Sequence, residues 1–371
     1  MSNKFKYLKK LTTIAKNKPV RAVIVAPVYK NRSGAINSSI EETYKLAQSL
    51  NIEPFLFLKP KIKKINKKYF IGEGLVSYLE SVAKDNPECI IIFNCELSAA
   101  WQRNLEIKLC SKILDRTELI LDIFVNRARS FEGKLQVELA KLKHESSRLV
   151  RVWTHLERQK GGIGLRGGPG EKQIETDRRI ISRKIVTVEK KLKSVVKTRS
   201  LHRSLRIRGK VPTVALVGYT NAGKSTLFNK LTKKEVLIKN MPFASLDTTL
   251  GKCFVDNECS CVVIDTVGFI HDLPKELLNA FRSSLEEVNT ADLIIHVLDV
   301  SDPNFSQHRE STNSILAEVL TREVPKIEVY NKADIVHCPT NINSTNDRLY
   351  ISASHNLGVA ELKIKIKDFL H

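Results

Sequence analysis

Short apolar runs alternate with amphipathic stretches over the first 133 residues. The runs 21–26 and 89–93 are rich in β-branched residues and have the length of buried strands. The stretches 39–50 and 98–110 repeat apolar residues at helical spacing. This order of strand, helix, strand and helix predicts a small parallel-sheet α/β domain, which we place at residues 1–133.

From residue 135 the apolar spacing changes to alternating steps of four and three, which is the seam of a coiled-coil helix. The first seam is Leu135, Leu139, Leu142, Ser146, Leu149, Trp153 and Leu156. A second seam with this spacing is Ile174, Arg178, Ile181, Ile185, Val188, Leu192 and Val195. No regular element is expected in the glycine-rich segment 161–170 between them. We predict an antiparallel helical hairpin with a glycine-rich tip at residues 134–209.

The remaining part, residues 210–371, is predicted to be a doubly wound α/β domain that begins with a phosphate-binding loop (P-loop). An apolar strand at 213–217 runs directly into GYTNAGKS, a match to GxxxxGK[ST], and a helical pattern follows. In such a loop the backbone N–H groups face phosphates, Lys224 neutralises the β- and γ-oxygens, and Ser225 offers a hydroxyl to Mg²⁺. The predicted phosphate site is Gly218, Tyr219, Thr220, Asn221, Ala222, Gly223, Lys224, Ser225 and Thr226.

A second motif, DxxG, follows the apolar strand 261–264. The carboxylate of Asp265 can hold Mg²⁺ through water, and the N–H of Gly268 can meet the γ-phosphate. Thr249 is the candidate switch threonine that completes Mg²⁺ coordination, with Thr248 as the competing choice. The predicted metal ligands are therefore Ser225 and Thr249, and the predicted catalytic residues are Lys224, Thr249 and Gly268.

The base is specified by an NKxD motif after the strand 326–330. The carboxylate of Asp334 can accept from both N1–H and the exocyclic amine of guanine, a donor pair that adenine lacks. Further along the chain, the N–H of Ala353 is suited to donate to guanine O6. The predicted guanine site is Asn331, Lys332, Asp334, Ser352, Ala353 and Ser354. The motifs thus predict binding of GTP and GDP with Mg²⁺, and Asp334 disfavours an ATP-driven helicase.

The formal net charge of +21 is concentrated as well as large. Residues 183–210 contain eleven Lys or Arg and one acid, Glu189. Because so few acids would relieve the repulsion, we expect an RNA-facing surface; a solvated helix face, or a lysine-rich composition from AT-rich coding, is the alternative. The predicted RNA or ribosome contacts around the tip loop are Arg158, Lys160, Arg166, Lys172, Arg178 and Arg179.

Other sequence features bear on the compartment. No stretch approaches the roughly 20 apolar residues of a membrane span, and the basic N-terminus lacks the apolar region of a secretory signal. The seven cysteines show no CxxC spacing, which argues against a disulfide framework or a zinc site. We expect a cytoplasmic, monomeric protein.

Several stretches resemble the HflX family of translation-factor-related GTPases. They include YFIGEG at 69–74, DRTELILDIF at 115–124 and, most specifically, the segment 153–179 around the glycine-rich loop. The resemblance implies binding to the large ribosomal subunit, with the N-terminal domain and the hairpin near ribosomal RNA at the peptidyl-transferase region. It also implies a role in splitting or rescuing stalled ribosomes. ATP binding by the N-terminal domain has been proposed within the family, but the sequence has no ATP motif there.

The chain departs from the family pattern at several positions. Thr248 stands where proline is common and Gly251 where arginine is common, and the sequence ends at His371 without the small extra domain that the family often carries. Phe269 stands where Ras-type enzymes place a water-orienting glutamine, so we expect slow intrinsic hydrolysis that ribosomes stimulate. The rival hypothesis is an RNA-binding or RNA-remodelling protein with a passive GTP switch and no ribosome dependence.

Overall fold

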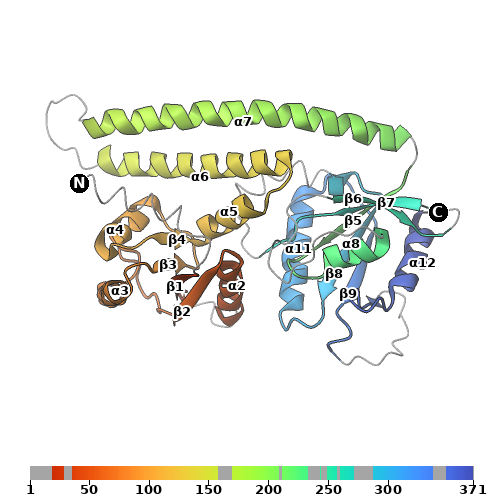
Figure 1. Ribbon diagram of the computed structural model, residues 1–371, viewed down its shortest axis with the longest axis horizontal. Coiled ribbons are helices and arrows are strands. Elements are labelled where there is room, and N and C mark those ends of the chain that lie inside the picture. Colours follow the sequence, from red (N-terminus) through yellow and green to blue (C-terminus); the bar gives the residue numbers. More distant parts are fainter. Residues whose placement is uncertain are drawn as a thin grey trace. The chain divides into compact units, whose positions relative to one another are not determined.

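The computed structural model describes residues 19–28, 36–157, 169–208, 211–232, 243, 249–256, 260–270, 287–336 and 348–370 (Figure 1). Within these ranges, the side chains of residues 36–38, 149–157, 169–174, 199–200 and 202–208 are not described. The predicted α/β class is confirmed, with two separate parallel-type sheets and two long helices between them in the sequence.

The N-terminal part of the described chain contains a four-stranded parallel sheet in the order β2-β1-β3-β4. Its strands are β1 (Val20–Val25), β2 (Ile52–Leu58), β3 (Ile90–Phe93) and β4 (Ile113–Asp115). The accompanying helices are α2 (Ile36–Ser49), α3 (Glu73–Asp85), α4 (Ala99–Leu109) and α5 (Arg116–Arg127). The strands at 20–25 and 90–93 and the helices at 36–49 and 99–109 agree with the predicted elements. One core lies between the sheet and α3 and α4, where alternate strand residues meet the apolar helix faces.

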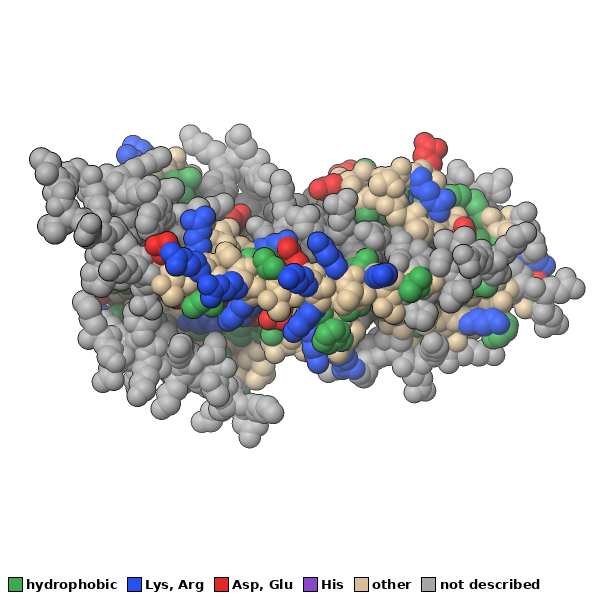
Figure 2. Space-filling model, turned by 90° about the horizontal axis from the view of Figure 1, so that it is seen from above, with side chains coloured by type: hydrophobic (Ala, Val, Ile, Leu, Met, Phe, Trp, Pro, Cys, Tyr) green, Lys and Arg blue, Asp and Glu red, His purple; other side chains and the backbone are tan. Residues whose placement is uncertain are grey.

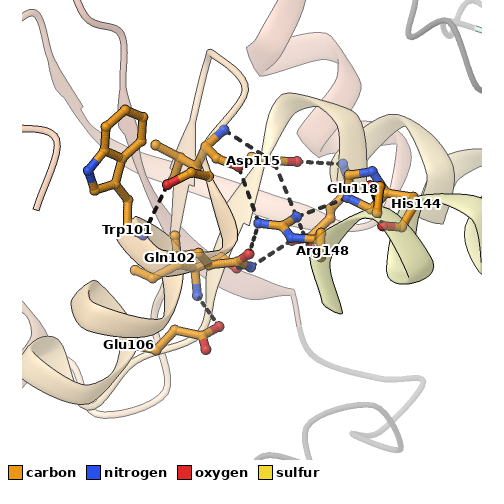
Figure 3. A network of polar contacts seen from close by, with 11 residues as sticks. Trp101, Gln102, Glu106, Asp115, Glu118, His144 and Arg148 are labelled. Atoms are coloured by element: carbon orange, nitrogen blue, oxygen red, sulfur yellow. Dashed lines mark hydrogen bonds and ion pairs between the residues drawn. The ribbon is translucent and has the colours of Figure 1, made fainter. Parts of the chain in front are cut away.

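A partly buried polar network attaches the end of β4 and the first turn of α5 to the helix that follows (Figure 3). The guanidinium of Arg148 donates to Glu118 at 2.7 Å and Asp115 at 3.3 Å, and it also donates to the side-chain oxygen of Gln102. His144 lies 2.9 Å from the same guanidinium. Burial, and secondarily the charge of Asp115, raises the pKa of Glu118 to about 7. This network gives a structural reason why Asp115 and Glu118 occur in the stretch 115–124, which resembles the family sequence.

Two long helices follow, α6 (Phe131–Glu157) and α7 (Pro169–Arg208). The first-seam residues Leu135, Leu139 and Leu142 are buried, and so is Val188 of the second seam. Lys143 of α6 and Glu189 of α7 form an ion pair at 3.1 Å, which joins the two helices. These observations agree with the predicted coiled-coil spacing, although α7 begins within the predicted tip segment.

Contacts divide the chain into two compact units, and each long helix contributes to both. One unit is Met1–Ile123 with His144–Ile181, and the other is Phe124–Lys143 with Ser182–His371. The division into three domains at residues 133 and 209 therefore stays a prediction. Among the described residues, no helix is both long and apolar enough to cross a membrane.

The C-terminal sheet has the order β10-β9-β8-β5-β7-β6 in the described residues, and only β6 is antiparallel to its neighbour. Its strands are β5 (Thr213–Gly218), β6 (Thr249–Phe254), β7 (Ser260–Asp265), β8 (Leu293–Asp299), β9 (Lys326–Asn331) and β10 (Leu349–Tyr350). Helices α8 (Lys224–Thr232) and α12 (Val359–Leu370) pack on one face, and α11 (Phe305–Val319) packs on the other. Helices on both faces are the doubly wound arrangement that the sequence predicts.

Candidate nucleotide site

The predicted P-loop lies between the central strand β5 and the start of α8. Gly218 has φ +150° and a Cβ there would overlap the carbonyl oxygen of Val297 on the neighbouring strand. Asn221 adopts the left-handed conformation with φ +63°, in which asparagine is tolerated. The loop therefore turns sharply from strand to helix, and it places the N-terminus of α8 beside the loop backbone, which is a favourable site for an anion.

Lys224 is held beneath this loop by backbone acceptors. Its Nζ donates to the carbonyl oxygens of Tyr219 at 2.8 Å and Gly218 at 3.1 Å. Burial lowers the pKa of Lys224 to about 8, and the nearby charge of Asp265 opposes this shift. A buried ammonium beside the P-loop can neutralise the charge of a bound phosphate far more strongly than an exposed lysine can.

The DxxG motif lies against the P-loop. A Cβ at Gly268 would lie 2.9 Å from Cα of Thr220 and 3.0 Å from Nζ of Lys224, so a side chain here would displace both groups. Thr266 donates to the carbonyl oxygen of Leu216 at 2.6 Å, which fixes the start of the motif to β5. The structure thus brings the predicted catalytic residues Lys224 and Gly268 together.

Three oxygen-bearing side chains converge at the carboxyl end of β7. Ser225 Oγ donates to Asp265 Oδ2 at 2.7 Å, and Asp265 is fully buried. Thr249 lies directly opposite Asp265 in the antiparallel pairing of β6 with β7. Hydroxyl and carboxylate oxygens are the ligand types that Mg²⁺ prefers, so Ser225, Thr249 and Asp265 fit this ion. The competing candidate, Thr248, lies outside the described residues.

Phe269 has no access to the space above the P-loop. Its side chain is 2% exposed and packs in the core between the sheet and α11. Its backbone pairs with the loop, because Phe269 N donates to Gly218 O at 3.1 Å and Thr220 N donates to Phe269 O at 2.7 Å. The position next to DxxG therefore stabilises the core and the loop, and its ring offers no polar group for orienting water.

The NKxD motif is tied to the P-loop through its asparagine. Asn331 donates from Nδ2 to the carbonyl oxygen of Ala222 at 2.8 Å and accepts from the N–H of Ala353 at 3.0 Å. One side chain thus positions three of the predicted binding segments. A Cβ at Gly223, which has φ +93°, would overlap this amide, so glycine is required there.

The other base-site residues lie beside this link. Lys332 Nζ donates to Asp299 Oδ2 at 2.6 Å. Asp334 Oδ2 lies 3.4 Å from Nδ1 of His355, and the hydroxyls of Ser352 and Ser354 are 3.1 Å apart. The structure therefore gathers all three predicted segments at one end of the C-terminal sheet. The partners Asp299 and His355 are not recognisable from the sequence, because no motif spacing marks them.

Sequence reasoning also missed an aromatic contact on the P-loop. Tyr219 stacks on His308 of α11, and Nδ1 of His308 lies 3.7 Å from Oδ2 of Asp302. A histidine in the first turn of an amphipathic helix gives no sequence signal for such a contact.

The predicted RNA contacts are only partly covered by the described residues. Arg158, Lys160 and Arg166 lie outside them, and the side chain of Lys172 in α7 is not described. Arg178 and Arg179 are exposed on α7, and Arg179 also pairs with Glu175 at 2.6 Å. Figure 2 shows Lys and Arg side chains following one another along this helix. The exposed basic residues with described side chains are Arg178, Arg179, Arg183, Lys184, Lys190, Lys191, Lys193 and Lys197.

Comparison with known families matches three consecutive models to the chain. Residues 37–125 match "GTP-binding GTPase N-terminal" and residues 127–206 match "GTP-binding GTPase Middle Region". Residues 213–332 match "50S ribosome-binding GTPase". The three matched ranges cover most of the chain; the strands β1 and β10 lie outside them.

Curated relatives carry one shared description. GTPase HflX of Escherichia coli (strain K12) is 44% identical over 329 residues, which cover 87% of this chain and 77% of that protein. GTPase HflX of Alkalihalophilus pseudofirmus is 41% identical over 359 residues, covering 96% and 84%. Among solved structures, the "SsGBP and GDP complex" has a TM-score of 0.51 at 23% identity and covers 95% of this chain and 98% of that one. This last likeness supports the fold.

Proposed function

The chain belongs to the HflX family of GTPases, and from this premise we propose that it binds the large ribosomal subunit and splits or rescues stalled ribosomes. GTP hydrolysis follows from family membership together with the P-loop GTPase domain. The ribosome role is supported by the exposed basic row along α7. Lys and Arg side chains release counterions when they bind RNA phosphates, and this release favours binding.

In the proposed reaction, the P-loop backbone from Gly218 to Thr226 cradles the phosphates, and Lys224 neutralises the β- and γ-oxygens. Its two backbone acceptors and its burial keep this ammonium at one position, so little reorganisation is needed during phosphoryl transfer. The N–H of Gly268 is proposed to meet the γ-phosphate, and Asp334 to select guanine. The N–H of Ala353 donates to Asn331 in the structure, so it would have to share that hydrogen bond in order to donate to guanine O6. Asn331 is a positioning residue, because it holds the base segment against the loop.

Mg²⁺ is the cofactor that this chemistry requires. Ser225 and Thr249 would hold the ion directly, and Asp265 would hold it through water. When bound, the ion neutralises charge on the β- and γ-phosphates. Thr249 is the first residue of β6 and pairs with Asp265 of β7, so its contact with the ion would couple the presence of a γ-phosphate to the pairing of these two strands. This coupling is the proposed route from nucleotide state to ribosome affinity.

Slow intrinsic turnover is part of the proposal. No polar group replaces a water-orienting glutamine at position 269, because the Phe269 side chain is buried in the core. We expect the ribosome to order the switch segments or to supply the missing group. The predicted RNA contacts Arg158, Lys160, Arg166, Lys172, Arg178 and Arg179 belong to the same proposal.

The decisive experiment is GTP turnover alone, with purified large subunits, and with free structured RNA. We expect stimulation by the subunit only. A matched variant, Lys190→Gln with Lys191→Gln and Lys193→Gln, should lose the stimulation and keep the intrinsic rate, because these side chains are exposed and lie on α7. Equal rates in all three conditions would favour the rival, an RNA-binding protein with a passive GTP switch.

The base specificity is tested by Asp334→Asn. The amide cannot accept both guanine donors, so GTP affinity should fall by about two orders of magnitude or more and xanthine nucleotides should bind better. Lys224→Ala should abolish tight binding of either nucleotide. Unchanged GTP binding in both variants would contradict the assigned site.

A further inference from the structure

We propose that the loop between β2 and α3 is a second RNA-binding surface, which contacts phosphates independently of α7. This lysine loop is defined as residues 59–68. The inference shares one premise with the proposed function, namely that the chain binds RNA, but it concerns a different surface in the N-terminal sheet domain.

The lysine loop carries a dense charge of one sign. Its sequence, KPKIKKINKK, has six lysines in ten residues. No acidic residue occurs between Glu53 and Glu73, and all six lysine side chains are exposed. The lysines are Lys59, Lys61, Lys63, Lys64, Lys67 and Lys68.

The charge of five of these lysines is not neutralised by an ion pair within the described chain, in contrast to other lysines of the same domain. Lys84 and Lys108 both pair with Glu80, at 3.2 Å and 2.7 Å, and these pairs lower the pKa of that carboxyl. Among the described residues, no carboxylate forms an ion pair with Lys61, Lys63, Lys64, Lys67 or Lys68. Mutual repulsion of uncompensated lysines destabilises the folded loop, so a polyanionic partner gives this arrangement a physical reason.

The backbone at the tip of the loop is nevertheless held by several hydrogen bonds. Asn66 and Phe70 exchange two backbone hydrogen bonds, of 3.1 and 2.9 Å. The side chain of Asn66 accepts from the N–H groups of Lys68 at 2.8 Å and Tyr69 at 3.0 Å. This backbone therefore holds the lysines in place before any ligand arrives, which lowers the entropic cost of binding.

Neighbouring α4 supports the same tip. Trp101 donates from its indole nitrogen to Lys67 O at 3.1 Å, and Asn104 donates to Lys68 O at 2.8 Å. The ring of Phe70 is buried and packs against Trp101 with centroids 5.0 Å apart. Both lysines at the tip thus have fixed carbonyls and exposed side chains.

The position of the lysine loop in the sheet also suits a phosphate ligand. The loop follows the carboxyl end of β2, and the backbone of Lys61 forms a parallel β-bridge with Val28, beyond the end of β1. Ligands of open parallel sheets bind outside these strand ends. The lysine loop contains no glycine, so it lacks the backbone cradle of a mononucleotide site. Charges spread along a chain fit the spaced phosphates of RNA better than one compact triphosphate.

The test compares two variants that remove equal charge from the same domain. Lys67→Gln with Lys68→Gln removes two uncompensated lysines, whereas Lys84→Gln with Lys108→Gln removes the two that are paired with Glu80. The full-length chain is titrated against a fluorescein-labelled 20-nucleotide uridine strand at several salt concentrations. For the loop variant, the slope of log K against log salt should become shallower by about 1.4, and affinity at 0.1 M salt should fall by about tenfold or more.

Three outcomes decide the inference. It stands if the control variant keeps the wild-type slope and if Lys67→Arg with Lys68→Arg restores binding, because arginine also contacts phosphates. It is overturned if the loop variant weakens binding no more than the control does, or if ATP displaces the strand only from chains that carry the intact loop. A variant of the α7 lysines that alone weakens binding would leave the proposed function in place and remove this second surface.

Discussion

Tyr219, the second residue of the P-loop, stacks on His308 of α11 with ring centroids 3.7 Å apart and planes inclined by 10°. The carbonyl of Tyr219 is one of the two backbone acceptors that hold Lys224. Nδ1 of His308 also lies 3.7 Å from Oδ2 of Asp302, so the ring edge has a second contact. The helix α11 therefore contacts the loop residue whose carbonyl oxygen holds the phosphate-binding lysine.

We expect His308→Ala to weaken GDP binding by about threefold to tenfold, because an aromatic pair contributes about 0.5–1.5 kcal/mol beyond its burial. His308→Phe should restore most of the affinity, since phenylalanine can keep the stack. Equilibrium binding of a fluorescent GDP analogue measures both variants. Equal losses in the two would show that the stack has no positioning role.

A second prediction concerns Gly223, whose φ is +93° and whose added Cβ would overlap the amide of Asn331. Gly223→Ala should break the hydrogen bond from Asn331 to Ala222 and lower the free energy of unfolding by about 2 kcal/mol or more. GDP affinity should fall by about tenfold or more, because the base segment loses its attachment. Gly74→Ala is the control, since nothing lies within 4 Å of a Cβ there. Urea unfolding and GDP titration of both variants give the comparison, and equal effects would rule out the steric explanation.

The lowered pKa of Lys224 predicts a pH dependence of nucleotide binding. Burial lowers this pKa to about 8 in the empty protein, and bound phosphates would raise it again. Above pH 8, therefore, nucleotide binding must take up a proton, and affinity should fall as pH rises. Calorimetric titration with GDP at pH 8.5, in two buffers of different ionisation enthalpy, should show uptake of about half a proton or more. The same titration at pH 6.5 is the control, where Lys224 is already protonated and its uptake should vanish.

The segments that the sequence marks as a nucleotide site lie together in the structure because each motif is local. Each of GxxxxGKS, DxxG and NKxD follows an apolar strand, and parallel strands bring their carboxyl ends to one edge of a sheet. Contacts between distant segments left no such signal, as Asp299 with Lys332 and Tyr219 with His308 illustrate. These pairs depend on tertiary packing, which spacing along the chain does not encode.

The N-terminal sheet was harder to predict for a related reason. Strand β2 contains Glu53 and Pro54 in its first half, and a charged residue followed by proline obscures the strand pattern there. Pro54 is tolerated because β2 lies at the edge of the sheet, where one side of the strand has no neighbour that needs a backbone N–H donor. The role of Arg148 was equally hidden, since the two carboxylates that it contacts, Asp115 and Glu118, lie 33 and 30 residues earlier in the sequence.

The last prediction concerns His296, a fully buried histidine on β8. Among the described residues neither ring nitrogen has a hydrogen-bond partner, and a carboxylate oxygen of Glu328 lies 4.0 Å from Nδ1. Burial lowers the pKa of His296 to about 4; Glu328 opposes the shift, and Lys326, Arg309 and Lys224 add to it. Because the folded-state pKa is below the ordinary value of 6.5, the unfolded chain binds the proton first as pH falls. Stability from the neutral ring is therefore complete above pH 6.5 and is lost as pH falls toward 4.

This linkage amounts to about 3 kcal/mol, at roughly 1.4 kcal/mol for each pKa unit. Urea unfolding at pH 6.5, 5.5 and 4.5 should show a steeper loss for the wild-type chain than for His296→Gln, whose amide does not titrate. Glu118 titrates in the opposite sense, because its raised pKa makes the folded chain bind the proton first, but it is present in both proteins and cancels in the difference. Parallel pH dependences of the two would show that His296 keeps an ordinary pKa, and hence that water reaches its ring within the core beside α11.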